Sequence, residues 1–390
     1  MKLDQVERGD TDGANVALLD TGNYPIAAGH PLSTAGSAAI GSALEAHRIA
    51  ANVVGPWQID ATFRRPAGPL NLTTTGPLGD ARSLAENKVL ADPIPDVVAK
   101  HGFIAGFSSL RAASPTMLLI NVVLRFPDAD SADAAASEMA DNVPFQDMTP
   151  RRMTIDRHPG AFATFYDGSG GTVIAISFGS YGGPYVLIQE IQILDRNDSA
   201  AAPALIAATL DKQEPLIDRF TPTDPTKLAD LPKDPTGQQL AHTLWAPDNS
   251  APYMGGVWDA NAWLHFEDDP VKAADLFKSA GVEMVTQRMT TVYQTRDAAG
   301  AAHVAEQFAE DIRALDGVHP ISGITGLPEA RCFARSNVSV EPGEPLTVLR
   351  VNWPFKCVAR ADRYAFIAFS SNEKDVKQQI AAQYRILAGK

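Results

Sequence analysis

The sequence has no long hydrophobic run and no concentration of positive charge. None of its 390 residues belongs to a stretch of the roughly 20 apolar residues that a membrane-spanning helix requires. The longest apolar run, from Met117 to Phe126, is interrupted by Asn121 and Arg125, which suits a buried strand. Lys and Arg number 33 against 46 Asp and Glu, a net charge of −13. We therefore expect neither a membrane-spanning segment nor a nucleic-acid partner.

Local catalytic and cofactor motifs are also lacking. The chain contains no Gly-x-Ser-x-Gly elbow, no His-Glu-x-x-His pair, no phosphate-binding Gly-x-x-x-x-Gly-Lys loop and no Gly-x-Gly-x-x-Gly turn. We expect no cofactor and no metal, and a non-enzymatic protein is favoured. A hydrolase with an unsignalled His, Ser and Asp set stays open as an alternative, because such sets can be assembled from distant residues. His101 and His265 could serve as general bases, although a hydrogen-bonded structural role is favoured for each.

Cysteine is scarce, with Cys332 and Cys357 the whole complement. They flank a predicted hairpin, which favours a disulfide between them over two free thiols. In the chain-entropy model, a bridge closing a loop of this length stabilises the fold by roughly 3 to 4 kcal/mol. A buried reduced pair is the alternative, and a metal site would need further ligands that are not evident. A disulfide would imply an oxidising compartment outside the cytoplasm.

What the sequence does contain is a repeat. Asp128-Ala129-Asp130 is echoed by Asp297-Ala298-Ala299, and Pro159-Gly160-Ala161 by Pro328-Glu329-Ala330. Both echoes lie at the same offset, since 297 − 128 and 328 − 159 each give 169. A shared offset predicts two diverged copies of one α/β unit. The carboxylates of Asp128 and Asp130 suit the start of a helix, where they accept bonds from free backbone N–H groups, better than a calcium site.

The two copies repeat the same order of predicted elements. Each has a helix that stops at a glycine, then a strand, a helix, a pair of strands and a closing helix. Because strand pairs joined by short turns are antiparallel, we predict an α+β fold of two tandem related domains, each a largely antiparallel sheet packed by helices. The expected strands and helices include Val16–Leu19, Ser37–Val54, Pro93–Lys100, Met117–Phe126, Tyr185–Ile193, Pro270–Ala280, and a second hairpin from Leu346–Asn352 and Tyr364–Phe369.

Composition sets the expected domain boundaries. Residues 1–14 are polar and rich in Gly and Asp, so they predict a flexible tether. The first copy is expected over residues 15–220 and the second over 237–390. Between them, residues 221–236 hold four prolines and no hydrophobic period, which predicts a linker.

Several segments resemble a family of actinobacterial (mycobacterial, nocardial and gordonial) exported lipoproteins of unknown function. They are Leu19-Asp20-Thr21-Gly22-Asn23-Tyr24-Pro25, Val54-Gly55-Pro56-Trp57, His101-Gly102-Phe103-Ile104-Ala105-Gly106-Phe107-Ser108-Ser109 and Trp353-Pro354-Phe355-Lys356-Cys357. The resemblance implies an extracytoplasmic protein anchored to the membrane by a lipidated cysteine. This chain shows neither the leader nor that cysteine, which we attribute to truncation ahead of Leu3. Cys332 and Cys357 match the family's C-terminal pair, which supports the disulfide.

One cluster of aromatic residues is a candidate ligand site. Trp245, Tyr253, Trp258 and Trp263 fall close together beside Gly255-Gly256. Flat aromatic faces and small glycines suit a groove for a sugar ring or an acyl chain, although filling a core is the favoured reading. The leading hypothesis is a non-enzymatic cell-envelope protein that binds an envelope lipid or glycolipid, or a membrane or exported protein partner. A scaffolding module that docks another exported protein is a further alternative, and the sequence does not indicate an oligomeric state.

Overall fold

The computed structural model describes residues 13–67, 74–246, 255–338, 340 and 346–389. They form two compact units, which we name by the copy that supplies most of each. The N-unit comprises Ser33–Lys233 and Asn261–Ala274, and the C-unit comprises the described parts of Met1–Leu32, Asp234–Ala260 and Asp275–Lys390. Of the predicted tether, residues 1–12 lie outside the described residues. Among the described residues, no helix has both the length and the apolar character needed to cross a bilayer.

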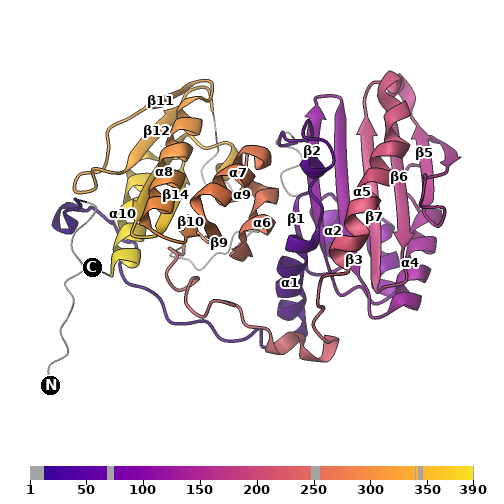
Figure 1. Ribbon diagram of the computed structural model, residues 1–390, viewed down its shortest axis with the longest axis horizontal. Helices are drawn as coiled ribbons and strands as arrows, with labels where there is room; N and C mark the ends of the chain where they lie inside the picture. Colours follow the sequence, from indigo (N-terminus) through magenta and orange to yellow (C-terminus); the bar gives the residue numbers. More distant parts are fainter. Residues whose placement is uncertain (1–12, 68–73, 247–254, 339, 341–345, 390) are drawn as a thin grey trace. The chain divides into compact units, whose positions relative to one another are not determined.

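A seven-stranded antiparallel sheet forms the centre of the N-unit, in the order β1-β2-β3-β7-β6-β5-β4 (Figure 1). The two longest pairings, β2 with β3 and β3 with β7, join buried apolar strands in the middle of the sheet. The strands are Gly76–Leu78 (β1), Ala105–Ser114 (β2), Met117–Arg125 (β3), Thr149–Met153 (β4), Phe162–Asp167 (β5), Val173–Ser180 (β6) and Tyr185–Ile193 (β7).

Helices cover both faces of the N-unit sheet. On one face α2 (Arg82–Glu86), α3 (Ile94–Lys100) and α4 (Ala129–Asp141) share a core with Ile120 and Val122 of β3. Because successive strand side chains point to opposite faces, Asn121 faces the other way, where it donates a hydrogen bond to Gln213 of α5 (Ala202–Ile217). Helix α1 (Ala38–Ile49) begins at the N-cap Ser37 and packs on β1 and β2.

The C-unit repeats this architecture. Its seven-stranded sheet has the order β8-β9-β10-β14-β13-β12-β11, again antiparallel throughout its described pairings. Numbered from its first strand, this is the same order as in the N-unit. The strands are Gly256–Asp259 (β8), Val282–Gln287 (β9), Thr291–Thr295 (β10), Val318–Pro320 (β11), Arg331–Arg335 (β12), Phe355–Ala361 (β13) and Tyr364–Ser370 (β14).

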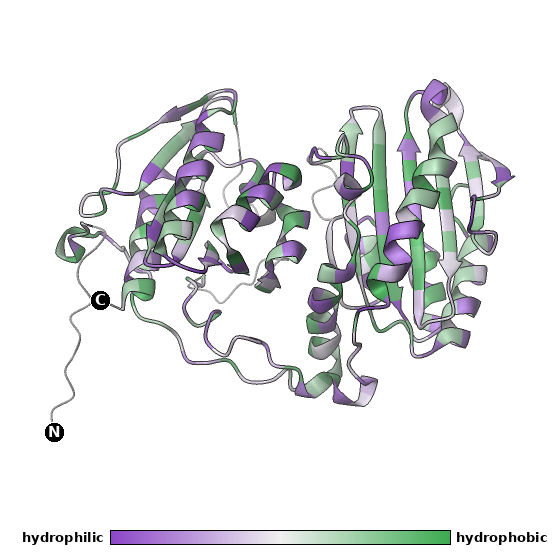
Figure 2. Ribbon diagram, in the orientation of Figure 1, coloured by the Kyte–Doolittle hydropathy of each residue, from purple (hydrophilic) through white to green (hydrophobic). Residues whose placement is uncertain are grey.

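Helices also cover both faces of the C-unit sheet. Helix α10 (Glu373–Ala388) packs Val376, Ile380 and Tyr384 on one face. Helices α7 (Pro270–Ala280) and α8 (Ala298–Arg313) meet the other face, where Tyr293 contacts Phe277 and Phe308 at ring-centroid distances of 5.8 and 4.9 Å. Two shorter helices are α6 (Ala260–Trp263) and α9 (Leu346–Val351). In Figure 2 the central strands are mainly hydrophobic, whereas the helices mix hydrophobic and hydrophilic residues.

The repeat is confirmed at the level of individual caps. Asp128 precedes α4 and accepts a bond from the backbone N–H of Ser131 at 2.8 Å. Asp297 precedes α8 and accepts one from Gly300 at 2.8 Å. The α+β class and the two related domains with antiparallel sheets are therefore confirmed.

Two predicted strands are wrong. Val16–Leu18 is a short 3-10 helix begun by Asn15, whose side chain accepts a bond from Ala17. Leu346–Val351 is helix α9, and the partner of β14 is β13. Both errors come from short apolar runs, in which periodicity does not separate a strand from a helical turn.

The proline-rich segment 221–236 differs from the expected linker, because most of it packs on the N-unit. Pro225–Asp230 forms a 3-10 helix against α1, capped by Asp224, and Leu228 is buried. Gly41 permits this approach, since a Cβ there would lie 2.1 Å from the carbonyl oxygen of Leu228. The units also depart from the expected boundaries at residues 13–32, which group with the C-unit.

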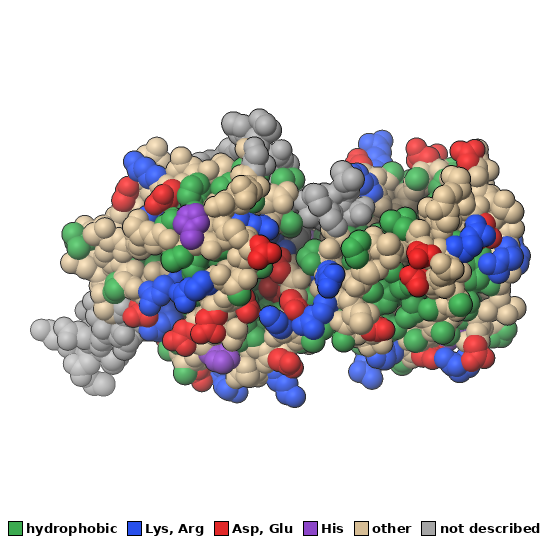
Figure 3. All heavy atoms as spheres, turned by 90° about the horizontal axis from the view of Figure 1, so that it is seen from above, with side chains coloured by type: hydrophobic (Ala, Val, Ile, Leu, Met, Phe, Trp, Pro, Cys, Tyr) green, Lys and Arg blue, Asp and Glu red, His purple; other side chains and the backbone are tan. Residues whose placement is uncertain are grey.

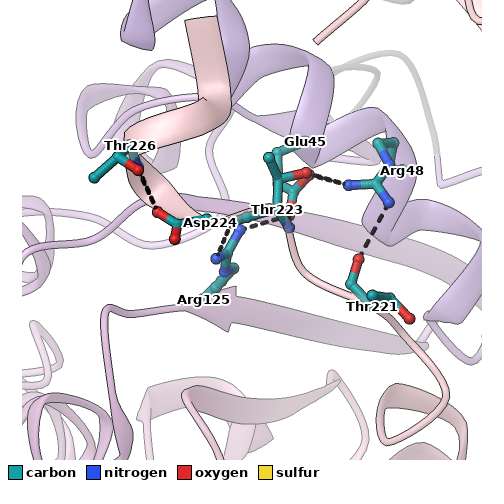
Figure 4. A network of polar contacts seen from close by, with 7 residues as sticks. All are labelled: Glu45, Arg48, Arg125, Thr221, Thr223, Asp224 and Thr226. Atoms are coloured by element: carbon teal, nitrogen blue, oxygen red, sulfur yellow. Dashed lines mark hydrogen bonds and ion pairs between the residues drawn. The ribbon is translucent and has the colours of Figure 1, made fainter. Parts of the chain in front are cut away.

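Glu45 of α1 holds the start of this segment in place (Figure 4). Its carboxylate is fully buried and lies 2.5 Å from both Arg125 of β3 and Arg48. It also accepts bonds from the backbone N–H and the hydroxyl of Thr223, each at 2.8 Å. The carbonyl of Thr223 in turn accepts from Arg125 at 2.5 Å. A buried carboxylate with two guanidinium partners thus fastens residue 223 to the sheet.

Candidate functional site

The two cysteines lie directly opposite each other on neighbouring strands of the C-unit. Cys332 of β12 pairs with Cys357 of β13, their Cα atoms are 4.1 Å apart, and the two form a disulfide. Both are buried in the core beneath α10. The bridge is therefore a structural part of the C-unit core and offers no exposed sulfur for chemistry.

The aromatic residues proposed as a ligand groove are largely core residues. Trp258 of β8 is 1% exposed and Trp263 is 0% exposed, so neither presents a face to a ligand on the surface. Trp245 is partly buried in the C-unit, where the guanidinium of Arg288 lies 5.4 Å from its ring centroid. Trp263 belongs to the N-unit, and Tyr253 lies outside the described residues.

Trp263 introduces an unusual part of the N-unit. Residues 261–274 lie between β8 and β9 in the sequence, yet they pack within the N-unit; we call them the strap. The indole N–H of Trp263 donates to Glu267 at 2.6 Å, and its ring contacts Phe266 at 5.1 Å. Phe266 in turn meets Phe107 of β2 at 6.0 Å. The strap thus supplies its own small aromatic core against the sheet.

His265 is the most deeply engaged residue of the strap. It is 3% exposed, and its ring contacts those of Trp57 and Phe107 at centroid distances of 5.1 and 5.0 Å. Nε2 lies 3.2 Å from the carbonyl oxygen of Ala50, which can only accept, so Nε2 carries the proton. Nδ1 then accepts a hydrogen bond from the hydroxyl of Ser109 at 2.8 Å. Burial, together with the positive charge of Arg111, lowers the pKa of His265 to about 3, so the imidazole is neutral.

This pairing has the geometry of a serine–histidine dyad but not the access that a dyad needs. Ser109 is 0% exposed, and the hydroxyl faces the ring in a closed interior. A carbonyl rather than a carboxylate orients the imidazole. The arrangement therefore holds the strap, and a substrate would reach Ser109 only after the strap moved.

Arg111 completes the attachment of the strap. The residue is 3% exposed, and its Nη2 donates to the backbone carbonyls of His265 and Glu267 at 2.8 and 2.7 Å. Its guanidinium also lies 5.7 Å from the ring centroid of Trp57. A guanidinium at the end of a helical turn satisfies carbonyls that have no partner within the turn. Arg64 adds an ion pair of 2.6 Å with Asp269, further along the strap.

The other polar clusters among the described residues give weaker evidence for a functional site. Nε2 of His101 lies 2.7 Å from Glu138, which also binds Lys100, and these hydrogen bonds lower the pKa of Glu138. A shallow hollow of about 600 Å3 near the start of α10 is bordered by Lys374 and Lys377, but Lys377 is already paired with Glu373 at 2.6 Å. Within the described ranges, no group of three or more His, Cys, Asp or Glu side chains could hold a metal ion. On the face seen in Figure 3, charged side chains of both signs are interspersed.

Sequence reasoning singled out Trp263 and His265 but not their partners. Ser109 and Arg111 alternate along β2, and 150 or more residues separate them from the strap. A Ser or an Arg in a strand carries no local signal of such a contact. Two of the strap's own features were visible, namely aromatic residues and a histidine beside an acidic run, Glu267-Asp268-Asp269.

Comparison with known proteins gives a family without an activity. A model described as "Domain of unknown function (DUF7373) N-terminal" matches residues 32–233, and one described as "Domain of unknown function (DUF7373) C-terminal" matches residues 216–390. No curated protein matches the chain. Among solved structures, the extracellular domain of PknH from Mycobacterium tuberculosis aligns at 14% identity and a TM-score of 0.28, covering 44% of this chain and 96% of that one.

Proposed function

This chain belongs to the DUF7373 family, and on that premise we propose that it is a non-enzymatic protein of the actinobacterial cell envelope that binds a membrane or exported protein partner. In its full-length form a lipidated cysteine anchors it outside the cytoplasm. The observation that carries this proposal is the buried disulfide between Cys332 and Cys357. Such bridges form and persist in oxidising compartments and are rare in the cytosol.

Burial of the chemically interesting groups supports binding over catalysis. The described residues hold a serine–histidine pair, but both members are enclosed. Burial of Trp258 and Trp263 likewise favours a protein partner over a lipid or glycolipid ligand, because the sequence-based groove depended on exposed aromatic faces.

Two measurements test the proposal. The first is location: the full-length protein, expressed in an actinobacterial host, should appear in the membrane fraction, be digested by protease added to spheroplasts, and resist alkylation until reduced. Two alkylatable thiols in unreduced, denatured protein would overturn the export argument. The matched control is the Cys332→Ala, Cys357→Ala double variant, which should take up no label in either state.

The second measurement concerns the partner. Crosslinking in intact cells followed by mass spectrometry should return one envelope protein in reproducible yield. Native mass spectrometry of gently purified protein should return the bare mass. A stoichiometric lipid travelling with the protein would replace the protein partner by lipid carriage.

An envelope hydrolase is the second candidate, because Ser109 and His265 lie 2.8 Å apart. It predicts that a fluorophosphonate probe labels Ser109 in the folded protein and that Ser109→Ala abolishes the label. An unlabelled folded protein would remove this candidate.

A further inference from the structure

The strap belongs to the second repeat in the sequence but packs in the N-unit. In the N-unit's own repeat, the segment between the first two strands is α2 and α3, whose Leu84 and Val98 belong to the core of that same repeat's sheet. The equivalent segment of the second repeat runs from β8 to β9 and includes the strap, which packs with the N-unit. The N-unit therefore has a surface that accepts a segment from outside its own repeat.

The strap's contacts define a groove in the N-unit. Phe107, Ser109 and Arg111 alternate along β2 and so point to one face of the sheet. Trp57 and the carbonyl of Ala50, which both contact His265, complete the groove. Together these groups receive an imidazole ring, an aromatic ring and two backbone carbonyls.

The groove's polar contacts recognise a shape of chain more than a particular sequence. Arg111 binds two carbonyls at the end of a helical turn, so it requires a backbone conformation and no particular side chain. Arg64, about one-third exposed, pairs with a carboxylate two residues beyond Glu267. Apolar side chains before the carbonyls and an acid after them are the chemistry that this groove fits.

We propose that this groove is a peptide-recognition site, filled in cis by the chain's own strap, and that it takes a segment of the same chemistry from a protein partner. That segment is a short helical turn with aromatic side chains, followed within a few residues by a carboxylate. The inference rests on the proposed partner-binding function and names its surface. Because the strap is tethered to the N-unit, it competes at a high effective concentration, and a partner displaces it only when the strap is weakened or the partner binds more tightly.

A labelled peptide tests this directly. The probe is fluorescein-labelled residues 261–274, measured by fluorescence anisotropy. The chain with Phe266→Ala and Asp269→Asn has a weakened strap, and near-UV circular dichroism and a cooperative urea transition establish that it is folded. We expect this variant to bind the peptide at least tenfold more tightly than the unaltered chain, whose groove is occupied. Equal binding by the two folded proteins would overturn the proposal.

A charge exchange makes the test specific to the groove. Adding Arg64→Asp to the strap-weakened chain should reduce its affinity for the peptide about tenfold. A peptide carrying Asp269→Arg should recover that loss with the Arg64→Asp chain and bind the Arg64 chain poorly. If the peptide's affinity is the same with Arg or Asp at residue 64, the peptide binds elsewhere and the assignment is overturned.

Hydrogen exchange of the unaltered chain covers the case in which the strap-weakened variant does not fold. Backbone amides of residues 264–267 should exchange through a local opening, faster than the amides of β2 and β3 in the same unit. Equal protection of the strap and these strands would mean that the strap leaves only on global unfolding, which contradicts a displaceable segment. Loss of peptide binding with envelope location and crosslinked partner intact would refute the groove alone and leave the proposed function standing.

Discussion

Gln213 of α5 and Gln383 of α10 make the same three hydrogen bonds in the two units. Each side-chain oxygen accepts two hydrogen bonds, one from a backbone N–H and one from another side chain. Each side-chain NH2 donates to a backbone carbonyl, which belongs to the residue two positions before that N–H. The partners are Val54 N, Asn121 Nδ2 and Asn52 O, each at 2.8 Å, in the N-unit, and Leu244 N at 2.8 Å, Thr290 Oγ1 at 2.5 Å and His242 O at 2.8 Å in the C-unit. Both glutamines are 0% exposed. Each one therefore fastens an irregular segment to the closing helix of its repeat.

We predict that Gln213→Ala and Gln383→Ala each destabilise the unit that contains the residue. Either change leaves a buried N–H and a partly buried carbonyl without the partner that the glutamine supplies, and each such loss costs about 1–3 kcal/mol. We expect a loss of about 2–4 kcal/mol in the free energy of unfolding, measured by urea denaturation. The matched control is Gln378→Ala, which removes only an exposed bond to Asp20 and should cost under about 1 kcal/mol. Equal losses for Gln378 and Gln383 would show that the buried bonds contribute nothing.

The ion pair between Glu45 and Arg125 gives a second prediction. Glu45→Gln removes the negative charge beside a guanidinium whose side chain is 4% exposed, and breaking a buried pair from one side costs about 3–5 kcal/mol. Urea denaturation should show a loss of this size. Hydrogen exchange at Pro225–Asp230 should accelerate as well, since Thr223 donates to both carboxylate oxygens of Glu45 and a glutamine side chain keeps only one acceptor oxygen. Glu86→Gln, at an exposed position of α2, is the control and should change stability by less than about 0.5 kcal/mol. An unfolding free energy within 1 kcal/mol of the unaltered chain would contradict the assigned role of Glu45.

The repeat could be predicted from the sequence because its signals are local. Asp128 and Asp297 cap helices through bonds to residues three positions on, and a cap of this kind leaves a short, readable motif. A β-rich run beside turn residues placed Tyr185–Ile193 where the structure has it, and an apolar helical face that stops at a glycine placed Pro270–Ala280. From these elements the α+β class and the antiparallel sheets followed.

The contacts that build the candidate site could not be predicted, because they join residues far apart in the chain. Ser109 meets His265 across 156 positions, and Glu45 meets Thr223 across 178. The proline-rich segment 221–236 shows the same limit. Its composition is typical of a linker, yet most of it packs on α1. Gly41 leaves room for the backbone of the segment, and the buried carboxylate of Glu45 accepts hydrogen bonds from Thr223. Composition reports a segment's own preference, whereas these partners lie on other elements.

We predict that the N-unit loses stability as the pH rises, because Glu190 of β7 is buried. It lies on the apolar face of the N-unit sheet, opposite Ile120 and Ile176, with one hydrogen bond from Gln192 at 2.7 Å. Burial raises the pKa of Glu190 from 4.5 to about 7. The folded state therefore binds the proton more tightly than the unfolded state, so this group's contribution is fully present below pH 4.5 and is lost between pH 4.5 and 7. At 1.36 kcal/mol per pKa unit the loss is about 3 kcal/mol.

Glu190→Gln removes this titration and keeps the size of the side chain. We expect the variant to gain about 3 kcal/mol over the unaltered chain at pH 8 and to match it within 1 kcal/mol at pH 4.5, as measured by urea denaturation at each pH. Glu86→Gln should change the two values equally. A gain at pH 8 no larger than that at pH 4.5 would mean that folding does not raise the pKa of Glu190.

For His265 we predict the opposite dependence, a loss of stability as the pH falls. This loss is best measured in the Glu190→Gln variant. Burial first, and the charge of Arg111 second, lower the pKa of His265 from 6.5 to about 3. The unfolded state then binds the proton more tightly, so this contribution is present above pH 6.5 and is lost as the pH falls towards 3. Between pH 6.5 and 5 the loss is roughly 2 kcal/mol. In the unaltered chain the contribution of Glu190 to stability increases by a similar amount over the same pH range, which hides the decline due to His265.

With Glu190→Gln in place, adding His265→Gln should reduce the decline in stability by roughly 2 kcal/mol, because glutamine does not titrate. Some decline should remain, since burial also lowers the pKa of His47 to about 4. An unchanged decline in the double variant would mean that His265 accepts its proton without leaving the strap's groove.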